Sequence, residues 1–108
     1  MADFQCLIYE VEDFVCTITL NRPEKRNALS PEMVVTLAEI WDELASDDAI
    51  RVALLTGAGN KAFSSGGDLG STIPLMMRSR EPRDDWERRL SADRKQLGRA
   101  VLRNATFF

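Results

Sequence analysis

Histidine is absent from this chain of 108 residues. Its absence excludes a Ser-His-Asp triad, a Cys-His catalytic pair and the usual histidine-containing zinc sites. Any chemistry within the chain therefore has to use carboxylates or backbone dipoles. We expect no metal ion and no separate cofactor.

Long apolar runs are missing too. The longest are only a few residues, as in Val52-Ala53-Leu54-Leu55, which excludes a transmembrane helix. The first residues, Met1–Gln5, lack the basic-then-apolar layout of a secretory signal. We therefore expect a cytoplasmic protein that does not bind membranes.

Cysteine is scarce, with Cys6 and Cys16 in two neighbouring predicted strands. Two thiols in an intracellular chain are more often small core residues than a disulfide or a metal pair. The predicted strand register places Cys6 opposite Thr19, on the far face of the hairpin from Cys16. A disulfide within the hairpin is therefore disfavoured.

Composition and charge indicate one small globular domain, residues 1–108. The apolar fraction is 44% and the charged fraction 29%, which is ordinary for a folded soluble chain. Residues 1–77 carry a net charge of -7 and residues 78–108 a net charge of +4. The basic part leaves polyanion binding as a minor alternative, but a solvated helix face is favoured and no nucleic acid is expected.

The first predicted element is a β-hairpin formed by 5–11 and 14–20, with Glu12-Asp13 as its turn. This register pairs Val11 with Phe14, Tyr9 with Cys16 and Leu7 with Ile18. Alternation then places these six side chains on one face of the hairpin. The turn lacks the favoured glycine.

A helix and a further strand follow. Ser30 is a typical N-cap, Pro31 suits the first helical position, and apolar residues then recur with a helical period up to Ser46. The run 50–56 predicts a buried strand, parallel to its neighbour because it follows a helical crossover.

Beyond Gly70 the pattern is weaker. Residues 71–82 indicate a loop or a fragmentary helix, and 84–104 a basic helix whose apolar stripe contains Trp86, Leu90, Leu97 and Val101. The final residues, Ala105-Thr106-Phe107-Phe108, resemble a truncated end.

One glycine-rich segment fits a dinucleotide fingerprint. Gly57-Ala58-Gly59-Asn60-Lys61-Ala62 matches G-x-G-x-x-A directly after a predicted strand. That motif must open straight into a helix, whereas Phe63-Ser64-Ser65-Gly66-Gly67 is a poor helix start. A nucleotide cofactor is therefore disfavoured.

The segment 61–69 is the more informative one. Gly66 and Gly67, followed by Asp68 and Leu69, predict a sharp turn that enters a helix. The N–H of Gly67 would then be an unpaired donor at the positive end of that helix, which is half of an oxyanion hole. Asp68 would cap the turn through its carboxylate. A plain surface turn is the alternative.

Three segments, 19–30, 48–59 and 61–69, occur in a characteristic order and spacing. Together they resemble the N-terminal part of the crotonase superfamily, the enoyl-CoA hydratase/isomerase family. The resemblance covers about residues 9–69. It implies an α/β fold of repeated β-β-α turns forming a spiral, and homo-oligomers that are trimers or dimers of trimers.

The resemblance also implies an acyl-CoA thioester as the ligand, with CoA forming part of the substrate. Gly67 takes the place of the family's first oxyanion-hole residue, which is catalytic. The implied substrate-binding residues lie in the loop before the first helix and in the later turn: Lys25, Arg26, Ala28, Leu29, Lys61, Ala62, Phe63, Ser64, Ser65, Gly66, Asp68 and Leu69. The cations among them, Lys25, Arg26 and Lys61, could pair with CoA phosphates.

The sequence also departs from the family. The second oxyanion donor and the catalytic glutamates of true hydratases lie in later segments that this chain does not contain, and Asp68, Glu24 and Asp84 are poor substitutes. The expected function is hydration of a 2-enoyl-CoA, within fatty acid metabolism, by the full-length protein. Isomerisation, decarboxylation and dehalogenation stay open as other reactions of the family, and a non-catalytic fragment or subunit is the alternative to an enzyme.

Overall fold

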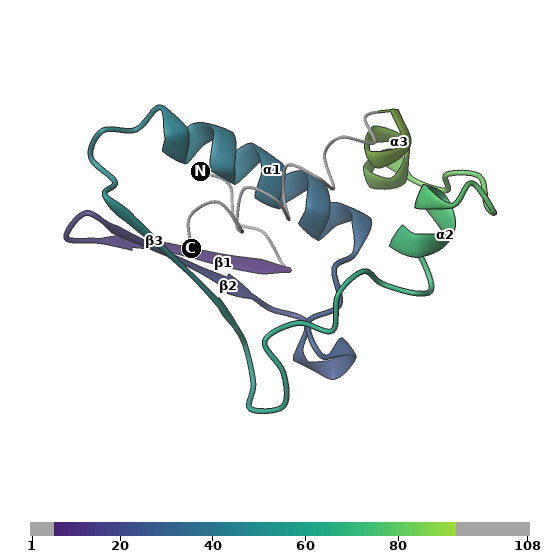
Figure 1. Cartoon of the computed structure of the whole chain (residues 1–108), viewed down its shortest axis with the longest axis horizontal. Coiled ribbons are helices and arrows are strands. Elements are labelled where there is room, and N and C mark those ends of the chain that lie inside the picture. Colours follow the sequence, from purple (N-terminus) through teal and green to yellow (C-terminus); the bar gives the residue numbers. More distant parts are fainter. Residues whose placement is uncertain (1–5, 93–108) are drawn as a thin grey trace.

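A long helix covers one face of a three-stranded sheet in the computed structural model, which describes residues 6–92 (Figure 1). The elements are β1 (Leu7–Glu12), β2 (Val15–Leu20), the 3-10 helix η1 (Pro23–Lys25), α1 (Pro31–Ala45), β3 (Val52–Gly57), α2 (Thr72–Met76) and α3 (Asp85–Ala92). The strand order is β1-β2-β3, with β1 antiparallel and β3 parallel to β2. The predicted β-β-α-β order is confirmed.

The hairpin turn lies one residue later than predicted. Asp13 and Phe14 form it, both with positive φ, so that Glu12 pairs with Val15 and Tyr9 with Ile18. The predicted register was therefore wrong by two residues. Because side chains alternate with a period of two, this shift leaves each strand residue on its predicted face.

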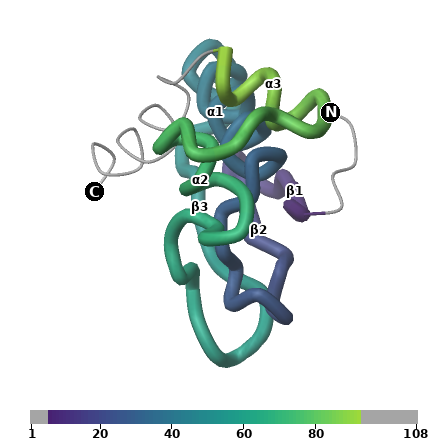
Figure 2. Tube along the Cα trace, turned by 90° about the vertical axis from the view of Figure 1, so that its right-hand side faces the viewer, coloured from purple at the N-terminus to yellow at the C-terminus, as the bar shows by residue number. Residues whose placement is uncertain are grey.

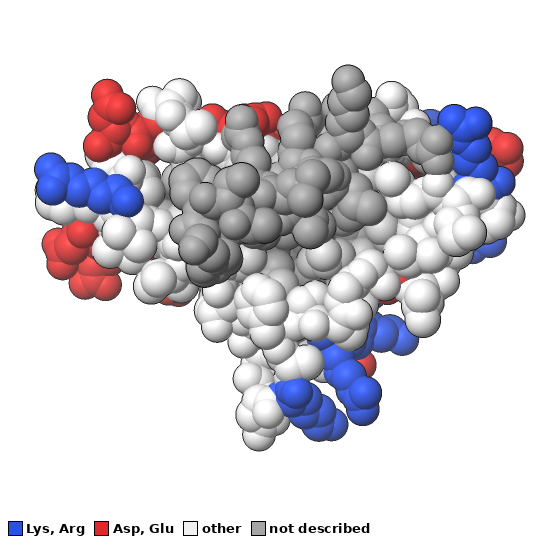
Figure 3. All heavy atoms as spheres, viewed as in Figure 1, with Lys and Arg blue, Asp and Glu red and all other residues white. Residues whose placement is uncertain are grey.

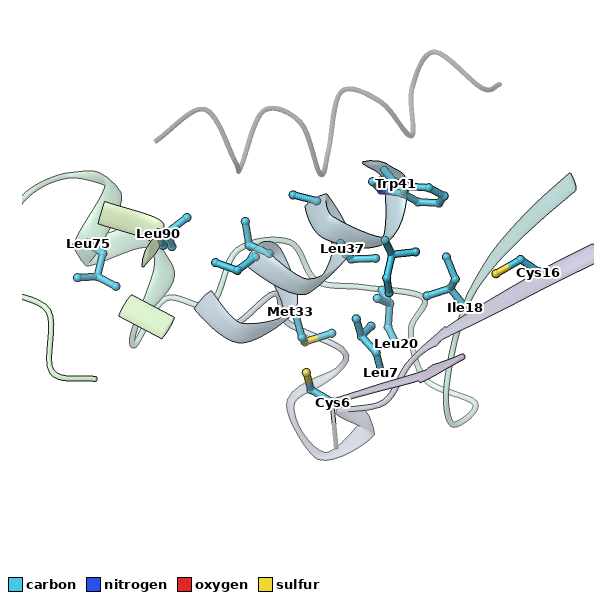
Figure 4. Close-up of a cluster of buried hydrophobic side chains, with 14 residues drawn as sticks. Cys6, Leu7, Cys16, Ile18, Leu20, Met33, Leu37, Trp41, Leu75 and Leu90 are labelled. Carbon is cyan, nitrogen blue, oxygen red and sulfur yellow. The ribbon is translucent and has the colours of Figure 1, made fainter. Parts of the chain in front are cut away.

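Helix α1 begins where Ser30 and Pro31 predicted. It begins at Pro31, and the Ser30 hydroxyl accepts a hydrogen bond from the Met33 N–H at 3.3 Å. Figure 4 shows Met33, Leu37 and Trp41 of α1 above Leu7, Ile18 and Leu20 of the strands. These side chains are at most 5% exposed and form the centre of the core.

The two cysteines are buried and free, as expected for core residues. The predicted position of Cys6 on the far face was wrong, since Cys6 and Cys16 belong to the same core cluster. Cys6 precedes β1, so strand alternation does not govern its side chain, which Figure 4 shows on the α1 side of the sheet. Burial raises the pKa of the Cys6 thiol to about 12, and Glu32 adds to this effect.

Strand β3 is less buried than predicted. Within the described residues it is an edge strand, and Val52 and Leu54 are 49% and 52% exposed. The register places them beside Val15 and Thr17, on the face of the sheet away from Ile18 and α1. The apolar run indicated a strand covered on both faces, whereas the described residues cover one.

The segment after Gly70 forms two short helices at one end of α1, as Figures 1 and 2 show. α2 has five residues, in agreement with the predicted fragmentary helix, and α3 packs beside α1 with Leu90 fully buried. The predicted positions Leu97 and Val101, and residues 105–108, lie outside the described residues. Between residues 6 and 92, no helix has the length and apolar character needed to cross a membrane.

Candidate functional site

Two loops, 21–30 and 57–70, lie side by side below the sheet (Figure 2). Asn27 joins them. It is fully buried, and its side-chain amide donates to the carbonyl oxygens of Ala58 and Ala62, each at 3.0 Å. Its Oδ1 accepts from the Arg22 N–H at 2.9 Å, and its own carbonyl accepts from the Ser64 hydroxyl at 2.8 Å. Every polar group of this side chain is thus bonded, which fixes the two loops relative to each other.

A short parallel bridge extends this contact to the predicted oxyanion turn. Leu29 pairs with Gly67: the Leu29 N–H donates to the Gly66 carbonyl at 2.7 Å, and the Asp68 N–H donates to the Leu29 carbonyl at 3.1 Å. The Thr72 hydroxyl donates to the same Leu29 carbonyl at 2.7 Å. The backbone on both sides of Gly67 is therefore held.

The Gly67 N–H itself points away from this bridge. In a parallel bridge, one residue bonds the two chain neighbours of the residue that it pairs with, and the N–H of that paired residue lies on the opposite side. Here Leu29 bonds Gly66 and Asp68, so the paired residue is Gly67. Gly67 is half-buried, and no acceptor among the described residues bonds its N–H. Within residues 6–92, the Gly67 N–H is thus a held donor without an acceptor, at the position that the resemblance assigns to the oxyanion hole.

The reason for this geometry differs from the prediction. The sequence predicted that Asp68 and Leu69 enter a helix directly, but α2 begins at Thr72 and is only five residues long. A tight turn intervenes, because the Asp68 carboxylate accepts from the Gly70 N–H at 2.7 Å. The extended bridge, and not a helix terminus, orients the donor.

Glycine suits both positions of the turn. Gly66 has φ of +94°, which side-chain-bearing residues rarely adopt. At Gly67, a Cβ would lie 2.7 Å from Cδ1 of Ile73, so that any side chain would displace this neighbour.

Asp68 is held by a cation as well as by the turn. Its Oδ2 accepts from the Arg22 guanidinium at 3.1 Å, and these side chains are 17% and 20% exposed. Burial alone would raise the pKa of Asp68, but the Gly70 N–H and the Arg22 guanidinium outweigh it, so this pKa lies below the usual value. Asp68 is therefore a fixed anion, as its predicted capping role requires, and a poor proton carrier near neutral pH.

Basic side chains gather at the end of the molecule where η1 and the loop after β3 lie (Figure 3). Here Arg26 and Lys61 line a pocket of 220 Å³ between the two loops. Its other lining residues are Pro23, Asn27, Ala58, Gly59, Asn60 and Ala62. An adjoining hollow of 370 Å³ includes Phe63. Two of the three predicted phosphate-binding cations are thus brought together.

The remaining predicted residues are distributed over both loops. Lys25 lies exposed on η1 and does not line the pocket. Ala28 and Leu29 face inward, and Leu29 takes part in the bridge. Ser64 and Ser65 bind the backbone of the first loop, with the Ser65 N–H donating to the Arg26 carbonyl at 3.0 Å. Phe63 and Leu69 are 54% and 82% exposed.

Sequence reasoning missed three residues that build the site: Arg22, Asn27 and Thr72. The sequence signal for Asn27 is its residue type, because asparagine tolerates positive φ. In the structure its φ is +56°. No sequence signal joins Arg22 to Asp68, which lie 46 positions apart. The same holds for Thr72 and Leu29.

The other carboxylates considered as catalytic groups lie elsewhere. Glu24 is exposed on η1, and the Asp84 carboxylate accepts from the Glu87 N–H at 2.8 Å at the start of α3. In the described part of the chain, no group of three or more potential ligand side chains could hold a metal ion.

Comparisons with known proteins identify the family of this chain. The family model for enoyl-CoA hydratase/isomerase matches residues 15–99. The chain belongs to this family. Among curated relatives, (E)-benzylidenesuccinyl-CoA hydratase from Thauera aromatica is 49% identical over 65 residues, which are 60% of this chain and 25% of that protein. The 1,2-epoxyphenylacetyl-CoA isomerase of Escherichia coli strain K12 is 48% identical over 63 residues, or 58% of this chain and 24% of that protein.

Solved structures of this family share the fold. An enoyl-CoA hydratase/isomerase from Mycobacterium paratuberculosis matches with a TM-score of 0.66 at 31% identity, over 86% of this chain and 35% of that one. An enoyl-CoA hydratase/isomerase from Pseudoalteromonas atlantica matches with a TM-score of 0.65 at 29% identity. This match covers 90% of this chain and 32% of that one. This family member therefore spans about a quarter of the length of these curated relatives, and its described residues form the N-terminal part of the crotonase fold.

Proposed function

We propose that this chain provides the first oxyanion-hole donor and part of the CoA site of an enzyme that acts through a thioester enolate. The observation that carries the proposal is the Gly67 N–H, which the Leu29 bridge holds in place and which has no acceptor among the described residues. The pocket containing Arg26 and Lys61 lies in the same pair of loops. The Gly67 N–H suits the thioester end of an acyl-CoA, and Arg26 and Lys61 suit its phosphates.

The chemistry requires such a donor. Addition to a conjugated enoyl thioester, or removal of the proton next to its carbonyl, transfers negative charge to the thioester oxygen. A backbone N–H that is already oriented stabilises this charge without reorganising, and the loss of one such donor costs about 3 kcal/mol of transition-state stabilisation. Arg26 and Lys61 would bind the CoA phosphates by charge-assisted hydrogen bonds.

Hydration of a 2-enoyl-CoA in fatty acid metabolism is the reaction we favour for the full-length protein. The name of one relative, a hydratase, supports this choice. Isomerisation is the competing reaction, since another relative is named an isomerase. A cytoplasmic homo-oligomer, trimeric or a dimer of trimers, remains part of the proposal, and the exposed apolar residues Val52 and Leu54 are consistent with further packing partners.

A second candidate is binding of acyl-CoA without turnover by the 108-residue chain. It is favoured by the state of Asp68, the carboxylate next to the donor, which is held by Arg22 and by the Gly70 N–H. A carboxylate whose pKa is lowered in this way has no proton to donate near neutral pH and is a weak proton acceptor.

Crotonyl-CoA separates these candidates. The 108-residue chain is expected to bind crotonyl-CoA more tightly than coenzyme A, because only the thioester offers an oxygen to Gly67. Loss of the conjugated ultraviolet absorbance would show hydration by this chain and refute the second candidate. Equal affinity for the two ligands, measured by calorimetry, would contradict the donor role.

A matched pair of variants isolates the N–H. Gly67→Pro and Gly67→Ala are both made in an Ile73→Ala background, which removes the contact at 2.7 Å that a Cβ would make. Only proline lacks the donor. We expect the alanine variant to retain the preference for the thioester and the proline variant to lose it.

A further inference from the structure

We propose that Arg22 is a positioning residue for the oxyanion donor, acting on Gly67 through its two neighbouring segments. This inference rests on the proposed function of Gly67. Arg22 does not line the pocket that contains Arg26 and Lys61, so its role is not that of another phosphate ligand.

The backbone on either side of Gly67 holds its N–H in place. Glycine has no side chain, so the direction of its N–H depends only on the backbone on either side. That backbone is fixed by an isolated bridge of two hydrogen bonds, from Leu29 to Gly66 and from Asp68 to Leu29. A bridge of this length has no neighbouring ladder to support it, and small segments of this kind open easily.

The Arg22 guanidinium bonds both segments that form the bridge. One nitrogen, Nη1, donates to the Ala28 carbonyl at 2.7 Å and to the Asp68 carboxylate at 3.1 Å. Ala28 directly precedes Leu29, and Asp68 directly follows Gly67. A single cation therefore bonds both segments of the bridge, next to the paired residue of each.

The two hydrogen bonds of the Arg22 guanidinium are of a strong kind. The Arg22 and Asp68 side chains are 20% and 17% exposed, so water screens their attraction less than it screens a surface pair. Both hydrogen bonds have a charged donor, and such bonds are stronger than neutral ones. The backbone of Arg22 is itself fixed by Asn27, which exchanges two hydrogen bonds with it. The buried Asn27 thus holds the Arg22 backbone, and the Arg22 guanidinium in turn holds Asp68 in the turn that contains Gly67.

Hydrogen exchange of the ligand-free chain tests the bracing. The variants are Arg22→Met, Arg22→Lys and, as a control with the same change of charge, Arg88→Met, which removes an exposed ion pair with Asp85. Relative to amides of the central strand β2, we expect the Leu29 and Asp68 amides to exchange at least about tenfold faster in Arg22→Met. Arg22→Lys should recover part of the protection, and Arg88→Met should have no effect. Equal acceleration of the bridge and of β2 would overturn the proposal.

The ratio of coenzyme A and butyryl-CoA dissociation constants tests the consequence for the donor. In Arg22→Met we expect coenzyme A affinity to stay within about twofold, because the phosphate-binding residues are unchanged, while the preference for the thioester is lost. A retained preference, with a loosened bridge, would refute the positioning role. If the unmodified chain shows no preference, the proposed function of Gly67 fails, and the exchange rates still decide whether Arg22 braces the bridge.

Discussion

Replacement of Asn27 is the perturbation whose effect the structure defines best. In Asn27→Ala, three side-chain hydrogen bonds are lost, two to the Ala58 and Ala62 carbonyls and one from the Arg22 N–H. The Asn27 side chain is fully buried, so these bonds lie in the interior of the loop pair. At about 1 kcal/mol for each bond, the loss amounts to about 3 kcal/mol.

The backbone adds a further contribution. Asn27 has φ of +56°, a conformation that disfavours alanine by about 1 kcal/mol relative to glycine. Asn27→Ala should therefore lower the free energy of unfolding by about 4 kcal/mol and Asn27→Gly by about 3 kcal/mol. Since small domains are stable by only about 5 kcal/mol or little more, the alanine variant should be largely destabilised.

Urea unfolding followed by tryptophan fluorescence measures these differences, because Trp41 lies in the core at 5% exposure. Asn60→Ala, at an exposed asparagine in the adjacent loop, serves as the control and should leave stability unchanged. A loss below about 1 kcal/mol in Asn27→Ala would show that the hydrogen bonds across the loops contribute little. Equal stability of the alanine and glycine variants would refute the contribution assigned to φ.

Three further outcomes are expected. Ser30→Ala removes the acceptor for the Met33 N–H and should cost about 1 kcal/mol in urea unfolding, whereas Ser30→Asp should not. Gly66→Ala, at φ of +94°, should cost at least about 1 kcal/mol although no atom lies within contact distance of the new Cβ, and an unchanged midpoint would contradict this. The pKa of Asp68 is lowered as described above, and the ion pair with Arg80 lowers the pKa of Glu87. Each ionised carboxylate therefore stabilises the folded chain fully above its usual pKa, 3.8 for Asp68 and 4.5 for Glu87. This stabilisation is lost as the pH falls through the folded pKa values. The urea midpoint should consequently fall on acidification through this range, and less steeply in Asp68→Asn/Glu87→Gln.

Local signals in the sequence predicted the main elements well. Ser30, Pro31 and the apolar period defined α1, and the run before Gly57 defined a parallel β3. The hairpin register failed because Asp13 and Phe14 both adopt positive φ in the turn, which is unusual for phenylalanine. The face of the sheet on which each strand residue lies was still predicted correctly, because the register shift was an even number of residues.

The site was predictable only in part. Gly67 was identified from its motif, but its orientation depends on Leu29, which lies far away in the sequence. The contacts of Arg22 with Asp68 and of Asn27 with Ala62 likewise join two loops that only the tertiary fold brings together. Hydrophobic periodicity carries no information about such polar contacts between loops.

The most direct test of the central claim is the chemical shift of the Gly67 amide during titration of the 108-residue chain, first with coenzyme A and then with butyryl-CoA. A hydrogen bond to the thioester oxygen should move the Gly67 amide proton downfield with butyryl-CoA and leave it nearly unchanged with coenzyme A. Indistinguishable responses of this amide to the two ligands, with binding of both established, would contradict the assignment of Gly67 as the oxyanion donor.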